Sequence, residues 1–127
     1  MFKRAFTEKF IIIYVSSGLT MDVENNRIMV DTIESFNPSY WSLKNPEGYL
    51  VYFRSKNKKN CHLSKSLYDS VKMLIINNDL FKEFKIGTSE GVVVTEIDLF
   101  GRVCFEPLGG AVNDAYKAQK GRADLIG

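Results

Sequence analysis

The sequence has little of what a disulfide scaffold, a multi-histidine metal site or a membrane-spanning protein requires. Its 127 residues include two cysteines, Cys61 and Cys104, and one histidine, His62. The cysteines lie far apart and lack metal-ligand spacing, which indicates free thiols in a reducing compartment. A single histidine excludes sites built from several histidines. No apolar run, including Phe10 to Val15, approaches the length of a membrane span.

The chain also lacks a strong excess of charge of either sign. The chain has 17 basic and 15 acidic residues, for a net charge of +2, which gives no strong attraction to nucleic acid or membranes. A secretory signal is not indicated either, because Glu8 and Lys9 directly precede the first apolar run and no small-residue cleavage pattern follows it. We therefore expect a cytoplasmic protein that does not enter the membrane.

One segment, 54–65 (RSKNKKNCHLSK), departs from this balance, with five basic residues and no acid. It can be an anion or nucleic-acid patch, or a solvated loop. No aromatic residue is interleaved with the charges to stack bases, which favours the loop. We do not expect nucleic acid as a partner.

From its length we expect residues 1–127 to form a single domain, and its apolar (45%) and aromatic (13%) residues are enough to bury a core. Apolar, β-branched stretches between turn signals predict strands of one sheet at 10–15, 49–53, 85–95 and 102–108. A further strand at 40–43 can form a hairpin with 49–53 through Asn45-Pro46-Glu47-Gly48.

Three helices are expected between and after these strands. The first runs from an N-cap at Thr20 to about 36, the second from Ser64 or Ser66 to about 77, and the third from Gly110 to Gly121. The order β-α-β-β-α-β, then β-α, predicts an α+β fold. It has a ferredoxin-like βαββαβ core with an added β-hairpin strand and a C-terminal helix. We expect one mostly antiparallel sheet with helices on one face.

The glycine pair Gly109-Gly110 opens the third helix, which carries Asn113. Free backbone N–H groups and the positive end of the helix dipole at such a start suit a phosphate. The same pair is also an ordinary strand-to-helix turn, and an asparagine in a first helical turn often serves as a cap. Local chemistry leaves both interpretations open.

Two patterns lie between Phe84 and Lys117: G-x-x-x-G-V-V from Gly87, and L-G-x-x-V-N-x-A from Leu108 to Ala115. This stretch resembles the class III nucleotide cyclases, the adenylate and guanylate cyclase homology domain. In that family the first pattern is a core strand. The second is a turn and helix whose asparagine and later arginine reach the nucleotide across a dimer interface.

The resemblance implies roles for individual residues. Asn113 matches the catalytic asparagine, and Lys117 stands at the arginine position, where it keeps the charge but loses the planar fork. Both would be vestigial catalytic residues. The implied nucleotide-binding residues are Lys44, Glu106, Gly109, Gly110 and Asn113. The implied partners are a purine nucleotide and a second copy of the chain or another protein.

Glu106 stands three residues before Gly109, where adenylate-type members carry an acid that accepts from the amino group of adenine. Lys44 lies one residue from the position of the family's partner lysine. An ordinary carboxylate at a strand end is the alternative for Glu106.

In the family, two aspartates hold two cations for displacement at phosphorus. Val15 stands at the first position and Glu47 is the counterpart of the second. One carboxylate cannot organise two hard cations, which leaves at most a weak single Mg²⁺ or Mn²⁺ site with a nucleoside triphosphate.

The resemblance thus implies a degenerate cyclase-like domain that binds a nucleotide or regulates a partner rather than catalysing. Two alternatives remain open. One is a small interaction protein, of immunity or inhibitor type, that uses a ferredoxin-like sheet as its docking surface. The other is an active cyclase with altered metal ligation.

Overall fold

The protein folds around a four-stranded antiparallel sheet with the strand order β2-β3-β1-β4. The computed structural model describes residues 4–18, 22–44 and 48–120. The elements in chain order are β1 (Arg4–Ser16), α1 (Val23–Ser35), β2 (Tyr40–Lys44), β3 (Gly48–Arg54), α2 (Lys58–Asn77), the 3-10 helix η1 (Asp79–Phe81), β4 (Lys85–Ile97) and α3 (Gly110–Ala118). The predicted α+β class with a ferredoxin-like core is confirmed. None of the helices in the described ranges is long and apolar enough to cross a membrane.

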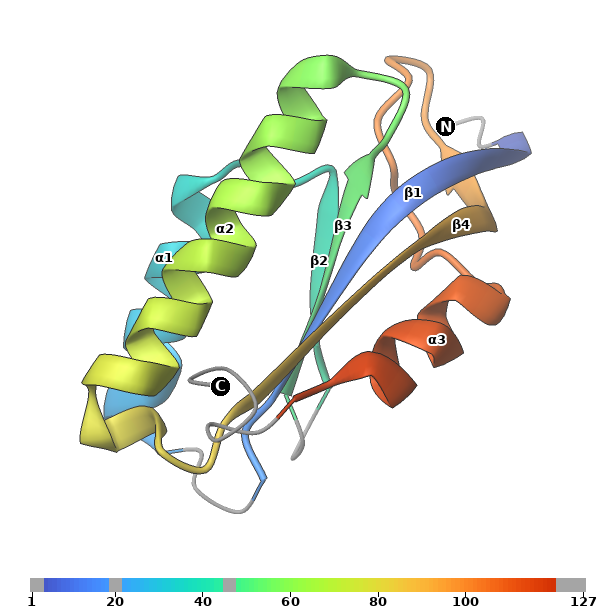
Figure 1. Ribbon diagram of the computed structural model, residues 1–127. Coiled ribbons are helices and arrows are strands. Elements are labelled where there is room, and N and C mark those ends of the chain that lie inside the picture. Colours follow the sequence, from blue (N-terminus) through green and yellow to red (C-terminus); the bar gives the residue numbers. More distant parts are fainter. Residues whose placement is uncertain (1–3, 19–21, 45–47, 121–127) are drawn as a thin grey trace.

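The sheet is covered on both faces, which gives the core two layers (Figure 1). Alternate residues of β1 point to opposite faces. Ile13 and Val15 pack in the layer under α1 and α2. Ile12 and Tyr14 pack in the layer under α3. The continuous apolar run of β1 is therefore buried on both sides, as a central strand requires.

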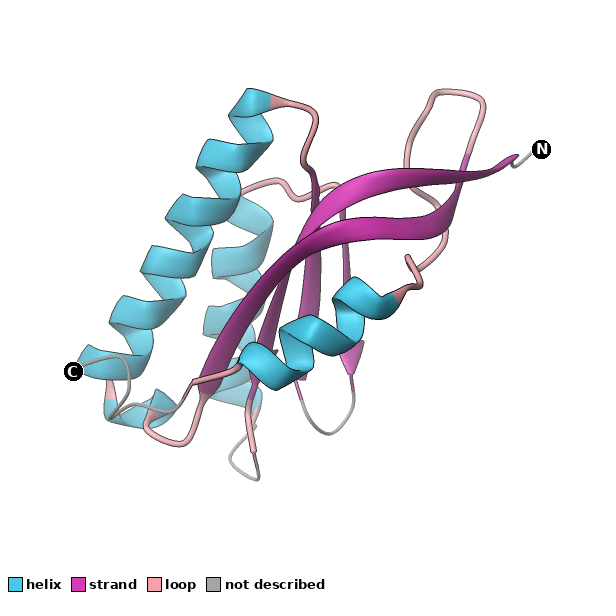
Figure 2. Ribbon diagram, turned by 45° about the vertical axis from the view of Figure 1, so that its right-hand side comes forward, coloured by secondary structure: helices cyan, strands magenta, loops and turns pink. Residues whose placement is uncertain are grey.

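The third helix differs from the expectation that helices lie on one face. Helices α1 and α2 share one face, whereas α3 crosses the opposite face (Figure 2). Its small residues Ala111 and Ala115 are buried there. Gly87 and Gly91 allow the close approach, because a Cβ at Gly91 would lie 2.8 Å from the Ala111 Cβ.

The segment 102–108 is not the regular strand that was predicted. It pairs with β4 through isolated bridges, between Val94 and Leu108 and between Ile97 and Val103, and through single hydrogen bonds such as that from the Cys104 N–H to the Glu96 carbonyl at 2.9 Å. A turn at 98–102 joins the two, with the Gly101 N–H donating to the Asp98 carbonyl at 3.0 Å. Between the two bridges β4 advances by three residues and this segment by five, so extra residues interrupt the ladder.

Helix α2 begins earlier than predicted, at Lys58, and its N-cap is Asn57. The Lys59 N–H donates to the Asn57 Oδ1 at 2.8 Å. Ser64 is instead buried inside the helix. Most of the basic segment 54–65 is therefore helix rather than loop. No acidic residue occupies the first turn of α2, so its helix dipole is not stabilised by a negative side chain. Packing of α2 against the sheet must supply the stability of this helix.

The N-cap of α1 is Asp22, which forms a capping box with Asn25. The Asn25 N–H donates to the Asp22 Oδ1 at 2.9 Å, and the Asp22 N–H donates to the Asn25 Oδ1 at 2.8 Å. Thr20, the predicted cap, and Gly121, the predicted end of the third helix, lie outside the described residues. The helix α3 ends at Ala118.

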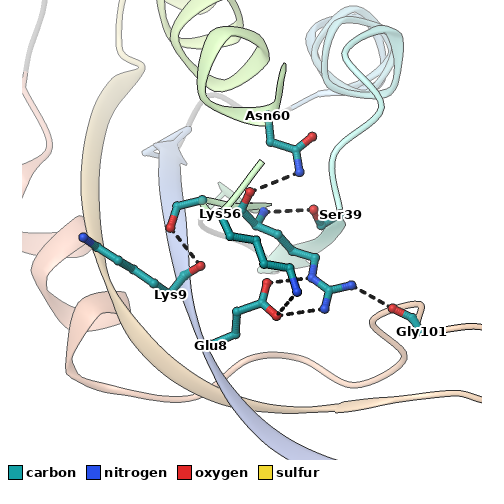
Figure 3. A network of polar contacts seen from close by, with 8 residues as sticks. Glu8, Lys9, Ser39, Lys56, Asn60 and Gly101 are labelled. Atoms are coloured by element: carbon teal, nitrogen blue, oxygen red, sulfur yellow. Dashed lines mark hydrogen bonds and ion pairs between the residues drawn. The ribbon is translucent and has the colours of Figure 1, made fainter. Parts of the chain in front are cut away.

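A polar network joins the end of β3 to β1 and to the turn after β4 (Figure 3). The Arg54 guanidinium donates two hydrogen bonds to the Glu8 carboxylate, at 2.7 and 2.8 Å. Its third bond goes to the Gly101 carbonyl at 2.8 Å. Lys56 Nζ lies 3.4 Å from Glu8 Oε1. The network fixes the turn from which the chain continues to Glu106.

The ion pair at Glu8 predicts an acid-sensitive contribution to stability. The hydrogen bond from Arg54 holds the pKa of Glu8 below its ordinary value of 4.5. A carboxylate with a lowered folded-state pKa stabilises the protein above about pH 4.5, and this stability is lost as the pH falls through the folded-state pKa. We expect Glu8→Gln to cost about 1–2 kcal/mol of unfolding free energy at pH 7, and less at pH 3.

Urea unfolding of both proteins at the two pH values measures this difference. The matched control is Glu90→Gln, because Glu90 forms an exposed pair with Lys9 at 3.7 Å, and such pairs contribute little. An equal difference between Glu8→Gln and wild type at both pH values would contradict the assignment.

Candidate functional site

A hollow of about 360 Å³ opens on the α3 side of the sheet, between β2–β3 and the start of α3. Such a volume lies within the range of small-molecule sites, roughly 300–1,000 Å³. Its polar lining residues are Lys44, Tyr52, Glu106, Asn113 and Tyr116. The other lining residues are Leu50, Pro107, Leu108, Gly109 and Val112.

An ion pair between Lys44 and Glu106 lies at the wall of this hollow. Lys44 ends β2, and Glu106 lies in the connection from β4 to α3. The Ser42 hydroxyl also donates to Glu106 Oε1, at 2.8 Å. The two charged side chains are 33% and 27% exposed, so a ligand in the hollow can still reach them. Two residues named from sequence alone are thus brought together.

The start of α3 forms another part of the wall. Gly109 is the N-cap, and no side chain caps the helix. A Cβ at Gly110 would meet no atom within 4 Å, so the backbone at this position borders open space. Asn113 lines the hollow instead of acting as a cap. A helix start of this kind offers N–H groups and a positive partial charge to an anion.

Lys117 and Val15 lie outside the hollow. Lys117 is exposed on α3 and is not among the lining residues. Val15, at the first metal position of the family, is fully buried in the core. Glu47, at the second position, lies outside the described residues.

The donor chemistry of the described residues does not fit a two-cation centre. In the described ranges, no three His, Cys, Asp or Glu side chains are grouped as metal ligands would be. A buried valine offers no oxygen to Mg²⁺ or Mn²⁺. We therefore derive no metal-assisted step for this chain.

Tyr52 and Tyr116 are polar lining residues that were not predicted from the sequence, and Tyr52 is the more deeply placed of the two. It is fully buried, and its pKa is raised, first by burial and then by the nearby charge of Glu106. Side chains alternate between the two faces of the sheet along β3, so Tyr52 shares a face with Leu50 and Tyr49 points to the other face. This alternation is the sequence signal that could have pointed to Tyr52. Sequence could place its ring on this face but could not show what its hydroxyl meets.

Two larger hollows contain none of the site residues predicted from sequence. One of about 530 Å³ lies between α1 and α2 and is lined by residues such as Phe36 and Met73. The other, of about 500 Å³, adjoins Arg54, which is paired with Glu8, and Arg102, which is paired with Asp98.

Comparison with known proteins finds similarity in structure but not in sequence. No family model matches the chain, and no curated protein sequence matches it. Solved structures of a bacterial light-regulated adenylyl cyclase are similar in fold. One has a TM-score of 0.58 at 18% sequence identity, over 90% of this chain and 40% of that chain. A second has a TM-score of 0.52 at 17% identity, over 88% of this chain and 69% of that chain.

The chain has a cyclase-like fold. At these identities the likeness shows the fold alone, and this chain corresponds to less than half the length of the first of these structures. Site chemistry must therefore be argued from the residues of the hollow.

Proposed function

We propose that this chain is a degenerate cyclase-like domain that binds a purine nucleotide and has a regulatory role rather than a catalytic one. The observation that carries the proposal is the Lys44–Glu106 pair in a hollow that also borders Asn113 and the start of α3. The hollow offers a carboxylate, an ammonium group, an amide and backbone N–H groups within one small volume. This combination can hold both a base and a phosphate.

Each group has a distinct part in the proposed complex. Glu106 accepts a hydrogen bond from the exocyclic amino group of the base, and Lys44 donates to a neighbouring acceptor atom. Gly109 and Gly110 present backbone N–H groups to a phosphate oxygen without help from metal. Asn113 supplies one further hydrogen bond to the nucleotide.

The site is open enough to be completed by a second protein chain. Leu108, which lines the hollow in the segment before α3, is 59% exposed. Exposed apolar side chains beside a ligand site are typical of an interaction surface when they form a patch. A homodimer, or a complex with a protein that the domain regulates, would cover this side chain.

Nucleotide titration tests the proposal. ATP, GTP, CTP and UTP are titrated into the wild-type protein by calorimetry, with and without Mg²⁺ or Mn²⁺. A parallel thermal-shift assay gives a second readout, because a ligand that binds only the native state raises the melting temperature. Binding of one purine nucleotide in preference to the others supports the proposal. Equal, millimolar or weaker binding of all four would remove it.

Catalysis gives a separate prediction. We expect no cyclic nucleotide from ATP or GTP with Mn²⁺, because Val15 stands where the family has its first metal aspartate and offers no ligand. Product is measured by chromatography after prolonged incubation at high protein concentration. Steady product that disappears in Glu47→Ala would instead establish an active cyclase with altered metal ligation.

An interaction protein of immunity or inhibitor type is the second candidate. It is favoured by three exposed apolar side chains after β4: Leu99 (69% exposed), Phe100 (79%) and Phe105 (48%). Exposed apolar groups of this size are typical of surfaces that bind proteins. This candidate predicts no nucleotide affinity in the wild-type protein.

A further inference from the structure

Tyr52 carries an unpaired hydroxyl in the interior of the protein. Its side chain is 0% exposed, and its hydroxyl oxygen has no hydrogen-bond partner among the described residues. Buried polar groups are nearly always paired, and leaving one unpaired costs free energy. Tyr49, in the same strand, shows the usual arrangement, because its hydroxyl donates to the Asn26 Oδ1 at 2.7 Å.

The place of Tyr52 in the fold suggests what its hydroxyl is for. Its ring is held between Phe10 and Tyr40, with centroid distances of 6.4 and 5.9 Å. Tyr52 also lines the hollow with Lys44 and Glu106. Lys44 and the Ser42 hydroxyl both contact one oxygen of the Glu106 carboxylate, Oε1. The packed ring therefore holds a polar group beside the site with no described partner to satisfy it.

We infer that the Tyr52 hydroxyl is a ligand-binding group that hydrogen-bonds the base of the nucleotide, an inference that rests on the proposed function. The carboxylate of Glu106 can only accept and the ammonium of Lys44 can only donate, whereas a phenol can do both. Tyr52 donates to a ring nitrogen of the base while Glu106 accepts from the amino group. The ligand class is an amino-substituted heteroaromatic base.

The test compares Tyr52→Phe with Tyr49→Phe. Both substitutions remove one hydroxyl from a buried tyrosine of β3, but on opposite faces of the sheet. We expect Tyr52→Phe to melt at or above the wild-type temperature without ligand, because it removes an unpaired group. Its ATP affinity should fall by roughly five- to hundred-fold. Tyr49→Phe should lower the melting temperature and leave ATP affinity unchanged.

The outcomes separate this inference from the proposed function. Equal ATP affinity in wild type, Tyr52→Phe and Tyr49→Phe would overturn the role of Tyr52 and leave the proposed function standing. A melting temperature in Tyr52→Phe that falls as far as in Tyr49→Phe, with affinity retained, would mean that the hydroxyl is structural. Absence of ATP binding in the wild-type protein would remove both, because no ligand would then meet the hydroxyl.

Discussion

Glu106→Ala is expected to weaken ATP binding by about 1–3 kcal/mol, or roughly five- to hundred-fold, while the fold is kept. The substitution removes the acceptor proposed for the amino group of the base. It also leaves Lys44 and the Ser42 hydroxyl without their shared partner. Glu106 is only partly buried, at 27% side-chain exposure, so the cost to stability should be small. Calorimetric titration, with circular dichroism as a folding control, measures both effects.

Two further variants sharpen this prediction. Glu106→Gln keeps one acceptor oxygen and loses the charge, so its affinity should lie between wild type and Glu106→Ala. Glu90→Ala removes an exposed carboxylate from β4 opposite Ile11, on the α1–α2 face of the sheet, and should bind ATP as wild type does. Equal loss of affinity in Glu90→Ala and Glu106→Ala would point to a general charge effect instead of a base contact.

Gly87→Val is expected to detach the end of α3 and to abolish the hollow with it. A Cβ at position 87 would lie 2.4 Å from the Gln119 backbone nitrogen and 2.6 Å from the Ala115 carbonyl oxygen. Backbone atoms cannot rotate away, so the helix must shift. Overpacking in a close-packed core costs about 1–3 kcal/mol or more. Hydrogen exchange should show early loss of protection in 110–118, and ATP affinity should fall below detection.

The matched control for this prediction is Gly110→Ala, in the first turn of the same helix. A Cβ there would meet no atom within 4 Å, and alanine is favoured over glycine inside a helix by up to about 1 kcal/mol. Its stability should equal or exceed that of wild type. Unchanged protection of α3 in Gly87→Val would show that the helix does not pack on β4 as described.

The sheet was largely predictable from sequence because its strands carry unambiguous patterns. The run from Phe10 to Val15 is apolar at every position and rich in β-branched residues, which is typical of a central strand covered on both faces. The third helix was predicted, but not the face of the sheet that it covers. That depended on the space left by Gly87 and Gly91, a tertiary property.

The errors have local physical causes. The start of α2 was placed too late because its first turn is basic, against the preference of the helix dipole, and Asn57 was not recognised as its cap. The segment 102–108 has strand-like residues, but extra residues between its two bridges to β4 interrupt the ladder. Of the site, Lys44 and Glu106 were found through a family resemblance. The unpaired hydroxyl of Tyr52 could be found only from its neighbours in space.

Chemical-shift mapping of the ¹⁵N-labelled protein during titration with ATP tests the central claim most directly. The claim is that the base and phosphate occupy the hollow between β2–β3 and α3. It predicts the largest backbone shifts at 42–44 and 106–113, with small changes in α1. Shifts confined to the basic start of α2, at 54–65, or no shifts at millimolar ATP, would contradict it.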